Sequence, residues 1–480
     1  MRQSILYSAG LTVFLLFALL ILPSLVQDGM FMDGMIYSTV AKNLSNGLGS
    51  FWDLHLSKFL LNDYRDQPPL TIWITSFFFD IFGNGMYTER IYSMVTAFLA
   101  VLMIRAVWKM IFTAQVEKQR LWWFPVLLFV ITPIVSWSFR NNMEENTMVL
   151  FILASTWFFL KGLLMQRETI VNLSLAVLMV FLAMMCKGIQ GTFTLITPMA
   201  ICLVFRNMKL SRAILYNAYS VALFLFFVFL LYAYTPSREY FTGYFHNRLE
   251  ETFQLASTAT TGNRFYLLYR VFSELLIALG ITLLLLGAFR KQFDRKTFFH
   301  SYDSRVLMFM LLVGLAGTLP LLVTLEQRGF YLVSTLPYFS MGLACLSLPV
   351  LNRLFYNSIL MKRVFATVNV ALIIVVLILT IINIGNVRRD RELLHDVYAI
   401  SQVVPKNSIL PVSANQYDNW SLYLYLKRYS NIDVKPQTNA SEQLPGGFFL
   451  RALSDTDSLP VESEKIPIIL SNYDLLQIKH

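Results

Sequence analysis

The stretch ILYSAGLTVFLLFALLILPSLV, from Ile5 to Val26, carries no charged residue and is about 22 residues long. A helix of that length, rising 1.5 Å per residue, crosses the roughly 30 Å hydrocarbon core of a bilayer. The apolar part of a signal peptide is usually only about 7–15 residues and precedes a small-residue cleavage site. We therefore expect this stretch to be a retained membrane-spanning helix.

The composition of the whole chain agrees with that helix. The 480 residues are 56% hydrophobic and only 14% charged, whereas soluble domains carry roughly 25% charged residues. These numbers exclude a disordered chain. A disulfide scaffold is excluded as well, because the three cysteines, Cys186, Cys202 and Cys345, all lie in apolar runs. The composition indicates a polytopic membrane protein.

Further apolar stretches of roughly spanning length follow the first one. Together with 5–26 they make about eleven, at 91–112, 121–139, 147–166, 170–186, 189–205, 213–235, 266–289, 306–325, 329–350 and 364–386. Pro69–Phe82 is also apolar, but its roughly 14 residues reach only about 21 Å. We interpret it as an interfacial helix lying on the bilayer.

The positions of the basic residues support this assignment. The net charge of +10 alone would suit nucleic acid, yet in a membrane protein Lys and Arg gather in cytoplasmic loops. With the N-terminus inside, every basic cluster between spans falls on that side, at 105–120, 161–167, 206–212, 290–305 and 353–363. Counting Pro69–Phe82 as a span would turn all of these clusters outward. The pattern predicts a multi-pass protein of the inner (cytoplasmic) membrane and no nucleic-acid partner.

Three regions then lie outside the cytoplasm, at about 27–90, 236–265 and 387–480. In the last region charges and prolines return, with alternating segments at Ser408–Val412, Phe448–Leu453 and Tyr473–Lys479 and helical patterns at Arg391–Val403 and Trp420–Tyr429. We expect an all-α transmembrane domain, residues 1–386, whose outer loop 27–90 carries the active site. A small periplasmic α/β domain, residues 387–480, follows it.

Ionisable residues are concentrated on the outer side, close to the ends of predicted spans. They include Asp33, Arg65, Asp66, Glu144, Glu145, Lys187, Arg248, Arg264 and Arg328, with Tyr331 beside the last. Ionisable groups at membrane depth are costly and usually functional. A carboxylate beside cations suits removal of a proton from an acceptor while a phosphate leaving group is held. Since the chain has no G-x-x-x-x-G-K-[ST] loop, and nucleotide sugars are cytoplasmic, we expect a lipid-phosphate donor.

The order of these motifs resembles that of the polytopic GT-C glycosyltransferases, in particular their bacterial protein-mannosyltransferase-like and aminoarabinose (lipid A) transferase-like branch. The resemblance rests on Asp33, Asp66 before Pro68-Pro69-Leu70, Phe82-Gly83 and Glu89-Arg90-Ile91-Tyr92-Ser93. It continues with Arg140 and Glu145, Lys187-Gly188, and Arg328-Gly329-Phe330-Tyr331 followed by Leu336-Pro337. The matching motifs cover about residues 30–340.

The resemblance implies roles for individual residues. Asp33 would be the base that deprotonates the acceptor hydroxyl, and Glu145 a second acidic residue that assists it. Asp66 and Lys187 would contact the donor, Lys187 near its phosphate. The chain departs from the family pattern at two places. Asp66-Gln67 replaces the Glu-Lys pair of the aminoarabinose branch, so that Arg65 would have to supply the cation. Asp33-Gly34 replaces the Asp-Glu of protein mannosyltransferases.

Simpler interpretations of the same residues stay open. Asp33 could be a helix N-cap, and Glu144 and Glu145 could be solvated residues or a cap at a span boundary. Lys187 could reach toward lipid headgroups. Arg248, Arg264 and Arg328 suit a lipid phosphate but equally suit anionic lipids or the interface.

The expected activity is transfer of a sugar from a polyprenyl-phosphate carrier to a lipid, glycan or protein acceptor at the outer membrane face. By the family's usual behaviour, the transfer would invert the anomeric configuration. No cofactor is called for; a divalent cation held by Asp33 and Asp66 remains an alternative. A secondary transporter or flippase of lipid-linked sugars is the competing function, although transporters tend to show internal repeats and midplane polar residues. A non-catalytic relative is the third.

Overall fold

The computed structural model describes residues 2–250, 260–354, 359–437, 447–454 and 463–478. The chain forms two compact units. The helical unit comprises Met1–Pro23, Arg65–Thr71 and Ser93–Ile382, and the mixed unit comprises Ser24–Tyr64, Ile72–Tyr92 and Asn383–His480. The first outer loop thus belongs largely with the C-terminal residues.

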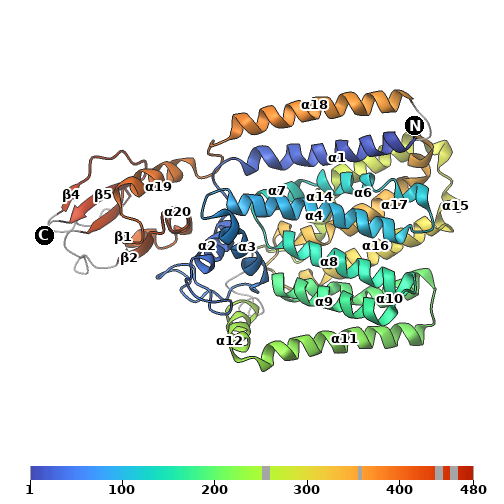
Figure 1. Ribbon diagram of the computed structural model, residues 1–480, viewed down its shortest axis with the longest axis horizontal. Coiled ribbons are helices and arrows are strands. Elements are labelled where there is room, and N and C mark those ends of the chain that lie inside the picture. Colours follow the sequence, from blue (N-terminus) through green and yellow to red (C-terminus); the bar gives the residue numbers. More distant parts are fainter. Residues whose placement is uncertain (1, 251–259, 355–358, 438–446, 455–462, 479–480) are drawn as a thin grey trace. The chain divides into compact units, whose positions relative to one another are not determined.

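The helical unit is built from long apolar helices that run roughly parallel to one another (Figure 1). Its helices are α1 (Arg2–Leu25), α4 (Thr88–Ile111), α5 (Val116–Gln119), α6 (Trp123–Val130), α7 (Pro133–Arg140), α8 (Glu145–Phe159), α9 (Thr169–Lys187), α10 (Thr197–Phe205), α11 (Leu210–Ala233), α12 (Thr235–Tyr244), α14 (Tyr266–Ala288), α15 (Arg295–Phe299), α16 (Tyr302–Thr318), α17 (Leu336–Leu354) and α18 (Ile359–Asn383). Each of the predicted spans overlaps a helix of this series, and 189–205 and 329–350 begin with the 3-10 segments Gly188–Ile196 and Gly329–Ser334.

Eight of the described stretches are long and apolar enough to cross a membrane, and the bent pair α5–α6 and α7 makes a ninth. The pair bends by 78° at Thr132-Pro133, where proline at the first position of α7 ends the preceding hydrogen-bond ladder. α17, in contrast, is among the shorter apolar helices. The protein is a multi-pass membrane protein.

The stretch from Thr169 to Phe205 is one continuous helical run in sequence but makes two passes. The backbone of Gly191 lies directly against Ala183, which a straight helix does not allow. At the other end, the Asn207 amide donates a 2.8 Å hydrogen bond to the Leu163 carbonyl, just before α9 begins. The chain therefore reverses at Gly188, as the separate predicted spans 170–186 and 189–205 require.

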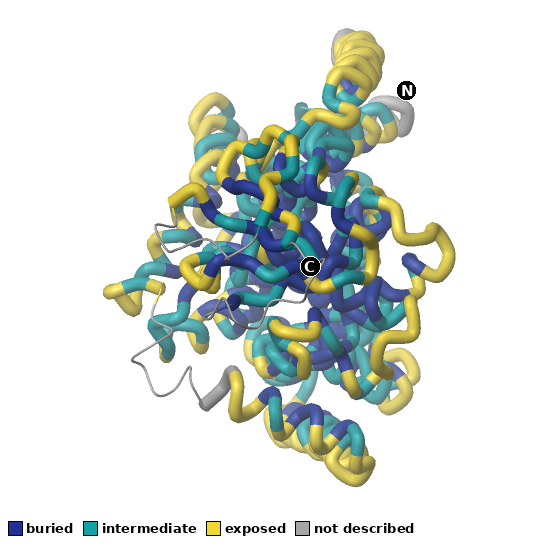
Figure 2. The backbone as a smooth tube through the Cα atoms, turned by 90° about the vertical axis from the view of Figure 1, so that its left-hand side faces the viewer, coloured by how far each residue is buried: buried dark blue, intermediate teal, exposed yellow. Residues whose placement is uncertain are grey.

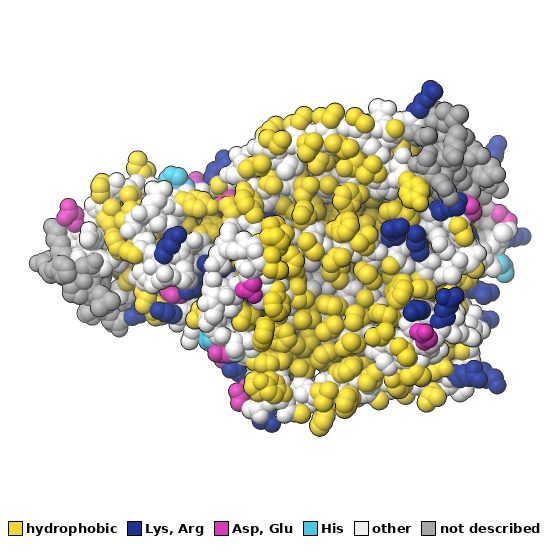
Figure 3. Space-filling model, in the orientation of Figure 1, with side chains coloured by type: hydrophobic (Ala, Val, Ile, Leu, Met, Phe, Trp, Pro, Cys, Tyr) yellow, Lys and Arg dark blue, Asp and Glu magenta, His cyan; other side chains and the backbone are white. Residues whose placement is uncertain are grey.

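Loops that carry basic clusters meet at one end of the helical unit. Lys118 pairs with Asp303, the Tyr302 hydroxyl donates to the Ile111 carbonyl, and the ring of Tyr302 packs on Phe205. Figure 3 shows Lys and Arg side chains gathered at this end, where α15 lies, with hydrophobic side chains over the helices beside it. We call it the basic end.

The outermost helices present apolar side chains outward. Only 6% of the apolar window of α11 and 11% of that of α18 is buried, and these helices are mostly exposed in Figure 2. A surface this apolar suits lipid, not water.

The mixed unit contains α2 (Met32–Ser45), most of α3 (Leu70–Phe82), α19 (Arg391–Val403), α20 (Trp420–Ser430) and a five-stranded sheet. The strands are β1 (Ile409–Ser413), β2 (Asp433–Gln437), β3 (Phe448–Ala452), β4 (Ser463–Lys465) and β5 (Tyr473–Ile478), in the order β2-β1-β3-β5-β4. β1 pairs in parallel with β2 and β3, whereas β5 pairs antiparallel with β3 and β4.

The sequence patterns located α19, α20 and the inner strands of this sheet but missed both edge strands. β2 contains Pro436, which cannot donate to a ladder and is tolerated at an edge. β4 has three residues, too few to show an alternating pattern.

Two buried basic residues of α20 tie this unit together. Arg428, 1% exposed, donates a 2.6 Å hydrogen bond to the Glu89 carboxylate and others to the carbonyls of Asn84 and Gly85. Lys427 pairs at 3.0 Å with Asp433 at the start of β2. Because each charge is matched, the cost of burying it is offset.

Candidate active site

A buried ionic cluster lies at the end of α9, far from the basic end. The Lys187 ammonium is 3.2 Å from Oε2 of Glu144 and 3.3 Å from Oε1 of Glu145. Its side chain is 7% exposed and both glutamate side chains are fully buried. The 19 residues of α9 place this cluster about 28 Å from the helix start, near Gly162. We call it the Lys187 cluster.

The chain geometry around Lys187 depends on glycine. Gly188 has φ +69° and ψ −148°, a conformation that is essentially reserved for glycine. It ends α9 and starts the 3-10 segment Gly188–Ile196, which turns back along α9. A side chain at position 188 would overlap the Tyr244 hydroxyl on α12. The Lys187-Gly188 pair is therefore a structural unit that fixes the direction of the lysine.

The two glutamates stand where α8 begins. Glu144 is the N-cap residue and Glu145 the first helical residue, but the Glu144 side chain makes no capping hydrogen bond. Their burial and their contact with Lys187 contradict the interpretation of solvated boundary residues. They contradict equally the interpretation of Lys187 as a lysine directed at lipid headgroups.

The 3-10 segment Gly329–Ser334 also borders the Lys187 cluster. The Lys187 ammonium lies 5.9 Å from the ring centre of Tyr331, within cation–π range. Tyr331 is held at both ends, because its carbonyl accepts a 2.7 Å hydrogen bond from the Gln190 amide and its hydroxyl donates to Glu326. Two residues that the sequence analysis singled out separately, Lys187 and Tyr331, are thus neighbours in the structure.

The segment Arg65–Gln67 of the helical unit packs on α12. The Arg65 guanidinium donates a 2.9 Å hydrogen bond to the carbonyl of Glu239, and the Tyr240 hydroxyl donates at 2.7 Å to the carbonyl of Gln67. Burial raises the pKa of Tyr240 well above its usual range, and the charges of Glu144 and Asp66 raise it further. Asp66 and Glu144 therefore share the surroundings of Tyr240.

Two outer loops are joined through Gln327. Its side-chain amide donates to the Arg264 carbonyl at 2.8 Å, and its side-chain oxygen accepts from the Leu267 N–H at 3.1 Å. Arg264 and Arg328, next to this link, are both exposed, and among the described residues neither guanidinium has an acidic partner. The side chain of Arg248 lies outside the described residues.

Asp33 belongs to the mixed unit. It is the second residue of α2 and partly exposed. The N-cap position of α2 is occupied by Phe31, without a side-chain capping bond, so the N-cap interpretation of Asp33 is wrong. A carboxylate in the first turn is still favoured by the positive end of the helix dipole.

Sequence patterns missed several residues that build the site. Tyr240, Tyr244, Gln190 and Gln327 are uncharged and lie in otherwise ordinary helical or loop sequence. The hydrogen bonds of Gln190, Tyr240 and Gln327 cross tens of residues along the chain, and no local pattern signals such contacts. Within the described parts of the chain, no group of three or more His, Cys, Asp and Glu residues is arranged to hold a metal ion.

In chemical terms, this end of the helical unit offers carboxylates, a buried ammonium and two exposed guanidinium groups within one set of linked loops. Guanidinium groups bind phosphate oxygens bidentately. Carboxylates accept protons or orient hydroxyl groups. The arrangement suits a reaction in which a phosphate departs and a hydroxyl loses its proton.

One family model matches part of the chain. Residues 66–232 match the family model described as dolichyl-phosphate-mannose-protein mannosyltransferase. No curated protein matches the sequence.

Solved structures share the fold across nearly the whole chain. ArnT from Cupriavidus metallidurans bound to undecaprenyl phosphate superimposes with a TM-score of 0.64 at 15% identity, covering 97% of both chains. Its apo state gives 0.61 at 14% identity, over 97% of this chain and 96% of that one. The apo form of the Archaeoglobus fulgidus oligosaccharyltransferase gives 0.54 at 12% identity, over 94% and 69%. The predicted resemblance to GT-C glycosyltransferases, and the predicted fold class, are confirmed.

Proposed function

We propose that this protein transfers a sugar from a polyprenyl-phosphate-linked donor to a lipid, glycan or protein acceptor at the outer face of the cytoplasmic membrane. The family-model match and the GT-C fold support a glycosyltransferase. The observation that carries the proposal is the Lys187 cluster, with its linked loops, at the end of the helical unit opposite the basic end.

The proposed step is a single displacement at the anomeric carbon. The acceptor oxygen forms a bond to that carbon as the bond between the carbon and the phosphate oxygen breaks. The electron pair of the broken bond leaves with the polyprenyl phosphate. The acceptor proton passes to the carboxylate of Asp33, and the configuration at the anomeric carbon is inverted.

Asp33 is proposed as the base because it is a partly exposed acidic residue in the first turn of α2. A base must reach the proton that it removes, and a carboxylate on the first turn of α2 is held on a rigid element. Glu145 is proposed to assist by keeping the Lys187 cluster in place and orienting the acceptor.

The donor phosphate is proposed to contact Arg264 and Arg328, which are exposed. Arg248 and Arg65 are proposed as further donor-binding residues. Lys187 has a different part in this proposal. Its ammonium lies between two buried carboxylates, so its charge first offsets theirs and only then contributes to the field felt by the phosphate. Asp66 would orient the sugar from the segment that packs on α12.

The test is release of free polyprenyl phosphate by the purified full chain, given polyprenyl-phosphate sugars with membrane glycolipids and peptides as acceptors. We compare the wild type with Asp33→Asn and, as a matched control in the same loop, with Asp53→Asn. Asp53 is an exposed residue that pairs only with His55 among the described residues. Loss of a catalytic base lowers turnover roughly 10²–10⁴-fold.

We expect that loss for Asp33→Asn and near wild-type release for Asp53→Asn, with both variants folded. Equal turnover in wild type and Asp33→Asn would remove Asp33 as the base. If the protein bound lipid-linked sugars but turned over none of the donors, sugar transfer would be contradicted and a transporter of these lipids would be favoured.

A further inference from the structure

A groove opens at the basic end of the helical unit, between the end of α10 and the start of α16. Its volume is about 740 Å³. Its lining includes Leu203, Arg206, Phe299, Arg305, Met308 and Leu312. No part of the site proposed above belongs to it, because the Lys187 cluster lies at the other end of α9.

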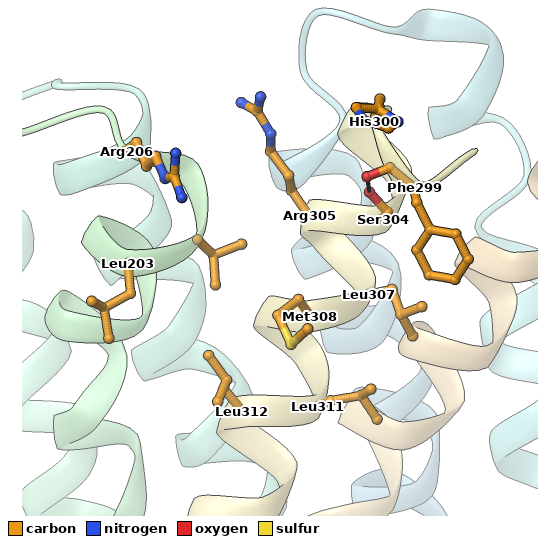
Figure 4. Close-up of a pocket in the computed structure, with 11 residues that line it drawn as sticks. Leu203, Arg206, Phe299, His300, Ser304, Arg305, Leu307, Met308, Leu311 and Leu312 are labelled. Atoms are coloured by element: carbon orange, nitrogen blue, oxygen red, sulfur yellow. Dashed lines mark hydrogen bonds between the residues drawn. The ribbon is translucent and has the colours of Figure 1, made fainter. Parts of the chain in front are cut away.

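The lining changes from charged to apolar along the helices. Figure 4 shows Arg206 and Arg305 with their guanidinium groups above the gap between α10 and α16, and the leucines and Met308 farther along the same helices. Arg305, Met308 and Leu312 are spaced so that they share one face of α16. On α10, Leu203 lies one turn before Arg206.

The two arginines at the mouth are not committed to acidic side chains. Within the described residues, neither Arg206 nor Arg305 forms an ion pair. The acidic residue nearest in sequence to Arg305 is Asp303, which is buried and already paired with Lys118. Asp294, just before α15, accepts from the Lys296 N–H and the Thr297 hydroxyl. The exposed, positively charged side chains of Arg206 and Arg305 therefore both lie at the mouth of a groove with an apolar lining.

Several of the apolar side chains that line the groove are largely exposed. Leu203 is 60% exposed, Met308 54% and Phe299 62%. Since α10 and α16 belong to membrane-spanning stretches, these side chains are suited to contact acyl chains. The combination suits a ligand with an anionic head and an apolar tail.

We propose that this groove binds one anionic phospholipid from the leaflet at the basic end. Its phosphate is held by the guanidinium groups of Arg206 and Arg305, which grip phosphate oxygens bidentately. One acyl chain lies along Leu203, Met308 and Leu312. Basic residues at a membrane surface attract anionic lipids.

The experiment measures lipid retention by the delipidated full chain in detergent. Phosphatidylglycerol and phosphatidylethanolamine with identical acyl chains are added in turn, and bound molecules are counted by native mass spectrometry. The pocket variant is Arg206→Gln with Arg305→Gln. The matched control is Arg212→Gln with Arg363→Gln, which removes the same charge from exposed positions outside the groove.

We expect the wild type and the control to retain one phosphatidylglycerol. The occupancy of bound phosphatidylglycerol in the pocket variant should be at least about fivefold lower. A charge-keeping variant, Arg206→Lys with Arg305→Lys, should fall between them because lysine does not grip phosphate bidentately. Wild-type retention by the pocket variant would overturn the proposal. So would an equal loss in the control, or equal retention of phosphatidylethanolamine. Displacement of the lipid by an equal concentration of soluble glycerol phosphate would show a phosphate site without a lipid.

Discussion

Lys187 and Glu144 are 43 residues apart in the sequence, yet the lysine ammonium lies 3.2 Å from the glutamate carboxylate in the protein interior. Glu145 brings a second carboxylate to the same ammonium. This relationship joins the start of α8 to the end of α9 and fixes the loop that carries Gly188. The pairing therefore holds the ends of α8 and α9 together at the candidate site.

Replacement of Lys187 by methionine should destabilise the protein strongly. The change removes the cation that offsets two buried carboxylates, and breaking a buried pair costs about 3–5 kcal/mol. Thermal unfolding in detergent should show a large fall in midpoint, whereas the control Lys161→Met, at a half-buried lysine beside Trp157, should change it little. Adding Glu144→Gln to Lys187→Met should restore part of the loss. A double variant less stable than the sum of the single changes would contradict the assigned pairing.

Replacement of Gly188 by alanine should disturb the site from the backbone. Alanine is strained at φ +69° and ψ −148° by about 1–3 kcal/mol, and its methyl group would meet the Tyr244 hydroxyl. Gly262→Ala is the matched control, since nothing lies within 4 Å of a side chain there. We expect a lowered unfolding midpoint and reduced polyprenyl phosphate release for Gly188→Ala alone. Equal behaviour of the two variants would show that the turn tolerates a side chain.

The mixed unit should become more stable as pH rises above neutrality. Burial, helped by the neighbouring charges of Arg428 and Lys427, lowers the pKa of Lys42 from its ordinary 10.5 to about 7, although Glu89 opposes the shift. Between these values the unfolded lysine binds more protons than the folded one, so the free energy of unfolding rises with pH. Below a pH of about 7, Lys42 is charged in both the folded and the unfolded state, and the full cost of burying that charge lowers the free energy of unfolding.

The measurement is the difference in unfolding midpoint between wild type and Lys42→Met at pH 6, 7.5 and 9, values chosen about the folded pKa of about 7. The unfolding midpoint of the wild type should rise relative to that of Lys42→Met as pH increases. Lys42 also donates to the carbonyls of Lys427 and Arg428, a contribution that the variant loses at every pH. A difference that stays constant across the range would show that Lys42 keeps its ordinary pKa.

Cysteine labelling should place the first outer loop and the basic end on opposite sides of the membrane. The three native cysteines are buried, so background labelling is low. Lys58→Cys, at an exposed residue of the first outer loop, should react with an impermeant thiol reagent from outside. Lys296→Cys, exposed on α15, should react only after the membrane is opened. Labelling of position 58 only from the cytoplasmic side would overturn the proposed orientation.

The interior of the C-terminal fold could be predicted because its pattern is local. The helix at Arg391–Val403 has the predicted bounds, since its apolar positions recur with helical spacing. The edge strands β2 and β4 could not be predicted, because they are defined by their pairing with β1 and β5 and not by their own sequence. The same reason explains why Gln190, Tyr240 and Gln327 were missed: their partners are distant along the chain.

The sequence by itself determined that this is a multi-pass membrane protein, where its helices run and that its basic clusters gather at one end of them. Those properties follow from hydropathy and charge over some twenty residues at a time. Only the tertiary structure decided that Lys187 lies between Glu144 and Glu145, and that Arg206 and Arg305 meet above one apolar groove. A contact between separate helices depends on how they pack, and no single stretch of sequence contains that information.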